Sequence, residues 1–77
     1  MKSIAIIGSG SWGAAIAIHL AKNGNKVKLW AFSEEDMNHI KQKQECRFLP
    51  GVKIPKSVEC TLDYKEAIEG TDMIVHV

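Results

Sequence analysis

Short apolar runs alternate along the chain with segments of helical periodicity. Residues 2–7 (K-S-I-A-I-I) are apolar at nearly every position, which is typical of a strand covered on both faces of a sheet. Residues 26–32 (K-V-K-L-W-A-F) alternate at first and then become apolar, and residues 72–77 (D-M-I-V-H-V) are again apolar. Together with residues 58–61, these runs predict four strands.

The segments between the strands carry helix signals. Residues 11–23 place small and apolar side chains on one face, and Gly24 follows at the position that ends a helix. Residues 33–44 begin with Ser33 as an N-cap, followed by three acidic residues that suit the positive end of a helix dipole. Residues 63–70 open on an aspartate cap and close on a glycine. We therefore predict three helices.

The order β-α-β-α-β-α-β predicts an α/β fold with a parallel sheet and right-handed crossovers. In a Rossmann-type doubly wound sheet these strands lie in the order 3-2-1-4. Residues 45–56 show no clear period and contain Pro50 and Pro55, so we expect a long irregular connection there, of a kind that is often functional. Residues 1–77 form one structural unit in this interpretation.

The length and the charge of the chain limit the functions that it can have. A chain of 77 residues that is 45% hydrophobic and 25% charged is typical of a globular domain, but it is too short for a second, substrate-binding domain. Ten Lys and Arg residues balance nine Asp and Glu residues without a basic stripe, which argues against nucleic acid as a partner.

Cys46 and Cys60 lack the spacing of a metal site, so we expect two free thiols in a reducing compartment. No apolar segment has the length of a signal peptide or a membrane span. The sequence therefore predicts a cytoplasmic protein that binds no metal and does not insert into a membrane.

Residues 8–13 read G-S-G-S-W-G, a G-x-G-x-x-G motif placed between the first strand and the first helix. Gly8 permits the tight turn, Gly10 lets the backbone approach a pyrophosphate, and Gly13 lets the helix pack closely on the strand. The helix N-terminus then offers N–H groups to the phosphates. This context predicts a dinucleotide site.

The end of the second strand gives no clear cofactor preference. An acidic residue there binds the ribose of NAD, and an Arg accommodates the 2′-phosphate of NADP, but this chain has Phe32 and Ser33. Phe32 fits a place beside the adenine, and Glu34 is better explained as part of the helix start than as a ribose ligand.

Two aromatic residues outside this strand have alternative places. Trp12 lies beside the cofactor or covers the helix in the core, and we favour the first. Phe48 closes over the nucleotide or covers the sheet edge, and these alternatives stay equal.

Four segments together resemble one family. They are residues 8–13, residues 17–24 (A-I-H-L-A-K-N-G), residues 27–30 (V-K-L-W) and residues 47–55 (R-F-L-P-G-V-K-I-P). In this order the chain resembles the N-terminus of bacterial NAD(P)-dependent glycerol-3-phosphate dehydrogenase over essentially its whole length. The tryptophan in the glycine loop and the R-F-L-P-G segment argue against other Rossmann dehydrogenases, such as the ketopantoate or hydroxyacyl-CoA types.

The resemblance implies an oxidoreductase that interconverts dihydroxyacetone phosphate and sn-glycerol 3-phosphate and supplies phospholipid synthesis. It implies cofactor contacts at Ser11, Trp12, Phe32, Ser33 and Phe48. The family often has a basic residue where Phe32 and Ser33 stand, so the choice between NAD and NADP stays open. The complete set of predicted cofactor residues is Gly8, Ser9, Gly10, Ser11, Trp12, Gly13, Phe32, Ser33 and Phe48.

No catalytic residue is assigned within the chain. The resemblance implies that the family's catalytic lysine and substrate-phosphate residues lie beyond Val77. We therefore expect residues 1–77 to be the N-terminal part of a dinucleotide-binding domain, without the substrate domain, that binds nucleotide weakly and has no dehydrogenase activity alone. The full-length enzyme would take a small phosphorylated substrate, and a homodimer is one expectation for it. An alternative of another class is a stand-alone NAD-sensing module without turnover.

Overall fold

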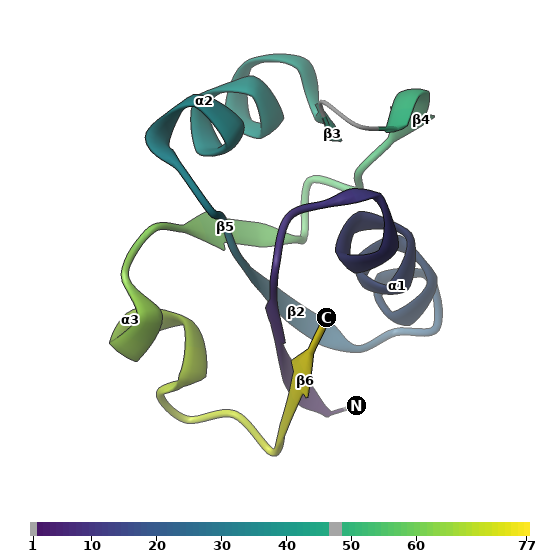
Figure 1. The fold of residues 1–77 in the computed structure, drawn as a ribbon. Coiled ribbons are helices and arrows are strands. Elements are labelled where there is room, and N and C mark those ends of the chain that lie inside the picture. The colour runs from purple at the N-terminus through teal and green to yellow at the C-terminus, as the bar shows by residue number, and fades with distance from the viewer. Residues whose placement is uncertain (1, 47–48) are drawn as a thin grey trace.

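A parallel sheet of four strands organises the computed structural model, which describes residues 2–46 and 49–77 (Figure 1). The strands are β1 (Ser3–Ile7), β2 (Lys26–Trp30), β5 (Glu59–Thr61) and β6 (Met73–His76). Their order is β5-β2-β1-β6, and every pairing is parallel. The predicted order 3-2-1-4 is therefore confirmed, with the first strand at the centre.

Both faces of the sheet are covered by helices. On one face, α1 (Ser11–Lys22) packs against β1 and β2, and α2 (Glu34–Lys43) packs against β5; Ile4 and Ile6 of β1 belong to the core cluster on this face. On the other face, α3 (Tyr64–Ile68) packs against Ala5 and Ile7 (Figure 1). All four of these β1 side chains are buried, which explains why the first strand shows no polar alternation.

The helix boundaries follow the predicted caps. The Ser33 hydroxyl accepts a hydrogen bond from the Asp36 N–H at 3.2 Å, and the Asp63 carboxylate accepts one from the Glu66 N–H at 3.2 Å. Gly24 adopts a φ of 87° just after α1, a conformation that costs glycine little. The two side chains cap the starts of α2 and α3, and Gly24 ends α1, in each case where the sequence predicts it.

The expectation of an irregular connection over residues 45–56 is wrong. The segment contains β3 (Glu45–Cys46) and β4 (Leu49–Lys53), which pair antiparallel in a second, two-stranded sheet. The register shifts between Glu45 and Cys46, and β3 is only two residues long, so no periodic pattern develops in the sequence. Non-local contacts hold the hairpin instead, because Cys46 and Ile54 are buried in the core cluster beneath α1 and α2.

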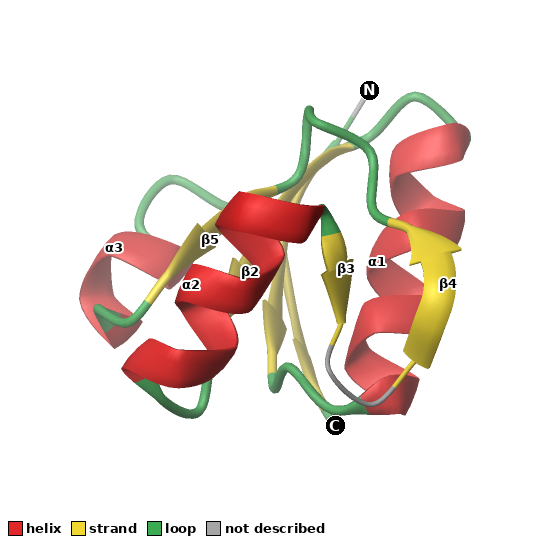
Figure 2. Cartoon of the chain, turned by 90° about the horizontal axis from the view of Figure 1, so that it is seen from above, coloured by secondary structure: helices red, strands yellow, loops and turns green. Residues whose placement is uncertain are grey.

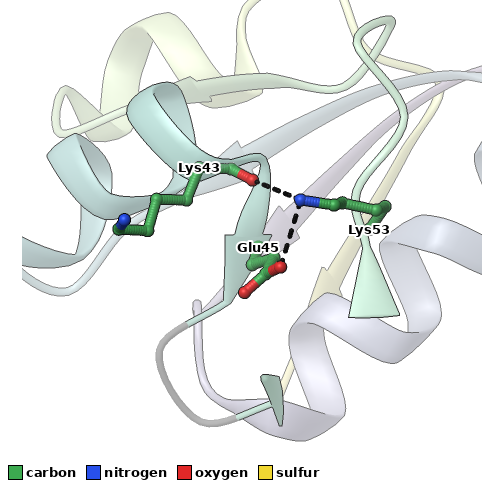
Figure 3. A network of polar contacts seen from close by, with 3 residues as sticks. All are labelled: Lys43, Glu45 and Lys53. Atoms are coloured by element: carbon green, nitrogen blue, oxygen red, sulfur yellow. Dashed lines mark hydrogen bonds and ion pairs between the residues drawn. The ribbon is translucent and has the colours of Figure 1, made fainter. Parts of the chain in front are cut away.

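Lys53 fastens this hairpin to the end of α2 (Figure 3). Its ammonium group lies 3.1 Å from the Glu45 carboxylate and donates to the Lys43 carbonyl at 3.3 Å. The hydrogen bond from Lys53, together with the Gly51 N–H, lowers the pKa of Glu45. In Figure 2, β3 lies between α2 and α1, and β4 lies over α1. Over the described part of the chain, no helix is both long and apolar enough to cross a membrane.

Candidate dinucleotide site

The glycine loop joins β1 to α1 at the carboxyl edge of the sheet. The Gly8 N–H donates to the Trp30 carbonyl at 3.2 Å, and the Val77 N–H donates to the Ile7 carbonyl at 3.2 Å. These bonds place the ends of β1, β2 and β6 side by side. Ligands of open α/β sheets bind at this edge, near the point where the strand order reverses.

Two of the three motif glycines are required by the fold itself. Gly8 has a φ of 139°, which side chains disfavour, and a Cβ there would lie 3.3 Å from the Phe32 ring. A Cβ on Gly13 would lie 2.2 Å from the Gly8 carbonyl oxygen, well inside van der Waals contact. The predicted tight turn at Gly8 and close packing at Gly13 therefore both have a geometric cause.

Gly10 differs, because the protein itself leaves room for a side chain there. Its φ is −73°, an ordinary value, and the nearest atom to an added Cβ is the Phe32 Cε2 at 4.0 Å. Neither backbone strain nor crowding explains the glycine. A Cβ at this position would instead point into open space above the loop, where a ligand that approaches the backbone would need it to be absent.

That space is a cavity of about 410 Å³, a size in the usual range of ligand pockets, at the start of α1. Its lining residues are Gly8, Gly10, Ser11, Trp12, Gly13, Phe32 and Val77. Trp12 is 75% exposed and Phe32 is 57% exposed, so two large aromatic side chains border the cavity without being used in the core. The alternative in which Trp12 covers the helix in the core is wrong.

The start of α1 is electrostatically suited to an anion. Within residues 2–46 and 49–77, α1 has no side-chain cap hydrogen bond and no acidic side chain in its first turn. By contrast, α2 is capped by Ser33 and carries three acidic residues in its first turn. The first N–H groups of a helix have no partner within the helix, and together with the dipole they attract phosphate. Of these two helices, only α1 has an N-terminus without a side-chain cap, and its first residues line the cavity.

The remaining predicted residues have other places. The Ser9 side chain is 1% exposed and turns into the protein, and Ser33 caps α2, so neither lines the cavity. Phe48 lies outside the described residues, and its cofactor contact stays a prediction. Val77 lines the cavity although the motif analysis did not select it; the predicted strand order, which places the fourth strand beside the first, was the available signal.

A second cavity, of about 450 Å³, lies away from the glycine loop between α2 and β5. Its charged lining residues have mixed signs, because two are lysines (Lys41 and Lys56) and two are glutamates (Glu59 and Glu66). Burial raises the pKa of the Cys60 thiol in its wall to about 11, so the thiol is protonated at neutral pH and a poor nucleophile. These mixed charges and the protonated thiol do not indicate one kind of ligand, whereas the helix start and the aromatic side chains of the first cavity do.

Comparisons with known proteins agree on one family. The family described as NAD-dependent glycerol-3-phosphate dehydrogenase N-terminus matches residues 3–77. Glycerol-3-phosphate dehydrogenase [NAD(P)+] of Bacillus pumilus is 43% identical over 76 residues, which are 97% of this chain and 22% of that protein. The enzyme of the same name from Bacillus subtilis is 40% identical over the same share of each chain. The chain thus spans about a fifth of the length of these curated relatives.

Solved structures give the same result. The crystal structure of glycerol-3-phosphate dehydrogenase from Coxiella burnetii superimposes with a TM-score of 0.89 at 34% identity, over 97% of this chain and 23% of that one. Glycerol-3-phosphate dehydrogenase from Saccharomyces cerevisiae superimposes with a TM-score of 0.84 at 30% identity, over 100% of this chain and 26% of that one.

Proposed function

The chain belongs to the family of NAD-dependent glycerol-3-phosphate dehydrogenases, of which it matches the N-terminal region, and from this premise we propose that its glycine-loop cavity binds the adenine dinucleotide of NAD(H) or NADP(H). The pyrophosphate lies at the start of α1, against the backbone of Gly10 and the N–H groups of Ser11 and Trp12. The aromatic faces of Trp12 and Phe32 flank the nucleotide, with Phe32 on the adenine side.

The observation that carries the proposal is the free space at Gly10. The fold accounts for Gly8 and Gly13 but makes no demand at Gly10, where an added Cβ would find its nearest neighbour 4.0 Å away. A ligand that lies against the loop backbone accounts for the third glycine. The bare, uncapped first turn of α1 supports the same ligand, because it supplies N–H donors and carries no negative side chain.

The bound cofactor would supply the hydride chemistry, and this part of the protein would hold and orient it. For the whole protein we propose the interconversion of dihydroxyacetone phosphate and sn-glycerol 3-phosphate, the latter serving as the backbone of phospholipids. We place no catalytic residue in residues 1–77, so the chain by itself should bind nucleotide without turning over substrate. Binding should be weaker than micromolar, because this chain corresponds to only 22% of the length of the Bacillus pumilus relative.

Amide NMR spectra recorded during titration with NADH, NADPH and ADP-ribose test the binding. The expected result is a saturable shift of the Gly10 to Gly13 amides by all three ligands, since all contain the adenine and pyrophosphate. Ribose 5-phosphate is the control for a nonspecific phosphate effect. Absence of shifts in the loop, or equal shifts with the control, would refute the proposed site. In parallel, NADH oxidation with dihydroxyacetone phosphate should stay at the rate without protein.

A further inference from the structure

A buried polar network lies beneath the glycine loop. The Ser9 side chain is 1% exposed, and its oxygen lies 3.3 Å from the Asp36 carboxylate, which is 5% exposed. The same Ser9 oxygen accepts a hydrogen bond from the Phe32 N–H at 3.1 Å. The Cys46 thiol, 1% exposed, donates to the Ser9 carbonyl at 3.1 Å. One serine therefore joins the loop to the end of β2, to α2 and to β3.

The direction of each bond follows from the groups present. A backbone N–H only donates, so the Ser9 oxygen accepts from Phe32 with a lone pair. The single hydroxyl hydrogen is then left for Asp36, whose carboxylate accepts it. The Asp36 N–H is used separately, because it donates to Ser33. Asp36 thus orients the Ser9 hydroxyl, and the Ser9 hydroxyl fixes the backbone of Phe32.

The two segments that Ser9 joins both line the cavity. Ser9 stands between Gly8 and Gly10, which belong to the loop wall, and Phe32 forms the wall at the end of β2. Phe32 carries an exposed ring, which makes an edge-to-face contact with Trp30 at 5.8 Å between ring centroids. The hydrogen bond to Ser9 ties its backbone directly to the loop.

We infer that Ser9 and Asp36 are positioning residues of the nucleotide site, which hold the glycine loop and Phe32 at the separation that the cofactor requires without touching it. The inference rests on the proposed function. Ser9 acts through the Phe32 backbone, and Asp36 acts through Ser9. A buried hydroxyl that is fully used inside the protein has no further hydrogen to offer a phosphate, so the Ser9 side chain contributes to binding only through this geometry.

Ser9→Ala tests the inference, with Asp63→Ala as the matched control. The control likewise removes a side-chain oxygen that accepts a hydrogen bond from a backbone N–H, that of Glu66 at 3.2 Å, but it does so at α3 on the opposite face of the sheet. Both variants are measured well below their melting temperatures. The two readouts are hydrogen exchange of the Phe32 amide and the initial slope of the loop amide shifts against NADH concentration, which is proportional to affinity.

In Ser9→Ala, the Phe32 amide should exchange at least tenfold faster, and the NADH slope should fall roughly tenfold, a change that corresponds to ~1.4 kcal/mol. Asp63→Ala should change neither. Asp36→Asn keeps an oxygen that can accept the Ser9 hydrogen bond and should bind NADH within threefold of the native chain, whereas Asp36→Ala should resemble Ser9→Ala.

The outcomes separate the two proposals. Unchanged NADH slope in Ser9→Ala, or an equal loss in Asp63→Ala, would overturn the positioning role while leaving the proposed function in place. Equal loss in Asp36→Asn and Asp36→Ala would overturn the role of Asp36 as a hydrogen-bond acceptor. If the native chain shows no NADH shifts, the proposed function and the positioning role both fail.

Discussion

Replacing Gly13 with alanine should destabilise the fold. The new Cβ would lie 2.2 Å from the Gly8 carbonyl oxygen and 3.0 Å from its carbon, both backbone atoms that no rotamer change can move away. Relief requires α1 to shift from β1, and overpacking of this kind costs ~1–3 kcal/mol. In a domain of this size each kcal/mol lowers Tm by ~4–8 °C. We therefore expect a fall in Tm of at least ~4 °C.

The same replacement at Gly10 should leave the fold intact and weaken nucleotide binding. An alanine at φ −73° is unstrained, and its nearest neighbour is 4.0 Å away. Reduced freedom of the unfolded chain favours the folded state by ~0.4–1 kcal/mol. Loss of a good N-cap residue opposes it by a similar amount. The net change in unfolding free energy should stay under ~1 kcal/mol, while the methyl group occupies the space proposed for the pyrophosphate.

Thermal unfolding and NADH titration of the two variants separate packing from binding. Gly10→Ala should lower Tm by less than Gly13→Ala does, and should lose at least tenfold in affinity. Gly13→Ala should show the large fall in Tm. A Gly13→Ala chain as stable as the native one would refute the packing argument. Full NADH affinity in Gly10→Ala would refute the assignment of the cavity to the pyrophosphate.

Three further changes test other parts of the structure. Ser33→Ala removes the cap that accepts from the Asp36 N–H and should lower the unfolding free energy by ~1 kcal/mol, measured by urea denaturation; an unchanged midpoint would contradict this cap role. Burial raises the pKa of Cys60 from 9.0 to about 11, so the stabilisation that depends on its neutral form is complete below pH 9 and is lost as the pH rises through 11. Between pH 9 and about 11, the unfolding free energy of Cys60→Ser should therefore fall less than that of the native chain. Parallel curves of unfolding free energy against pH for the two chains would exclude the effect. Lys53→Met should raise the pKa of Glu45 towards its ordinary value, as followed by carboxyl NMR, with little change in Tm because Lys53 is 69% exposed; an unmoved pKa would show that the ion pair does not form in solution.

The elements that the sequence predicts are those set by local patterns. An apolar run with no polar alternation predicts a central strand, and Ile4 and Ala5 are indeed buried on opposite faces of β1. Ser33 and Asp63 predict helix starts because a cap needs only a short side chain and an N–H three residues later. Strand order then follows from general rules of α/β connection.

The hairpin of β3 and β4 and the Ser9 network could not be predicted in the same way. The hairpin depends on Cys46 and Ile54 reaching a core built by other elements. The Ser9 hydroxyl meets a carboxylate 27 residues away, and neither residue type indicates burial on its own. The motif predicts that the loop needs small residues, but not which direction the one side chain between Gly8 and Gly10 takes.

The contrast between α1 and α2 explains how a nearly neutral chain can hold a ligand with two phosphates. The net charge is +1, and no cationic side chain lines the glycine-loop cavity within the described residues. At α2, the serine cap and three acidic side chains satisfy and neutralise the helix end. At α1, the glycine N-cap supplies no side chain, so the first N–H groups and the dipole remain for the ligand. In the proposed site, phosphate affinity would thus be determined by which helix start is left without a cap, and the same glycine that withholds the cap also leaves the space above it open.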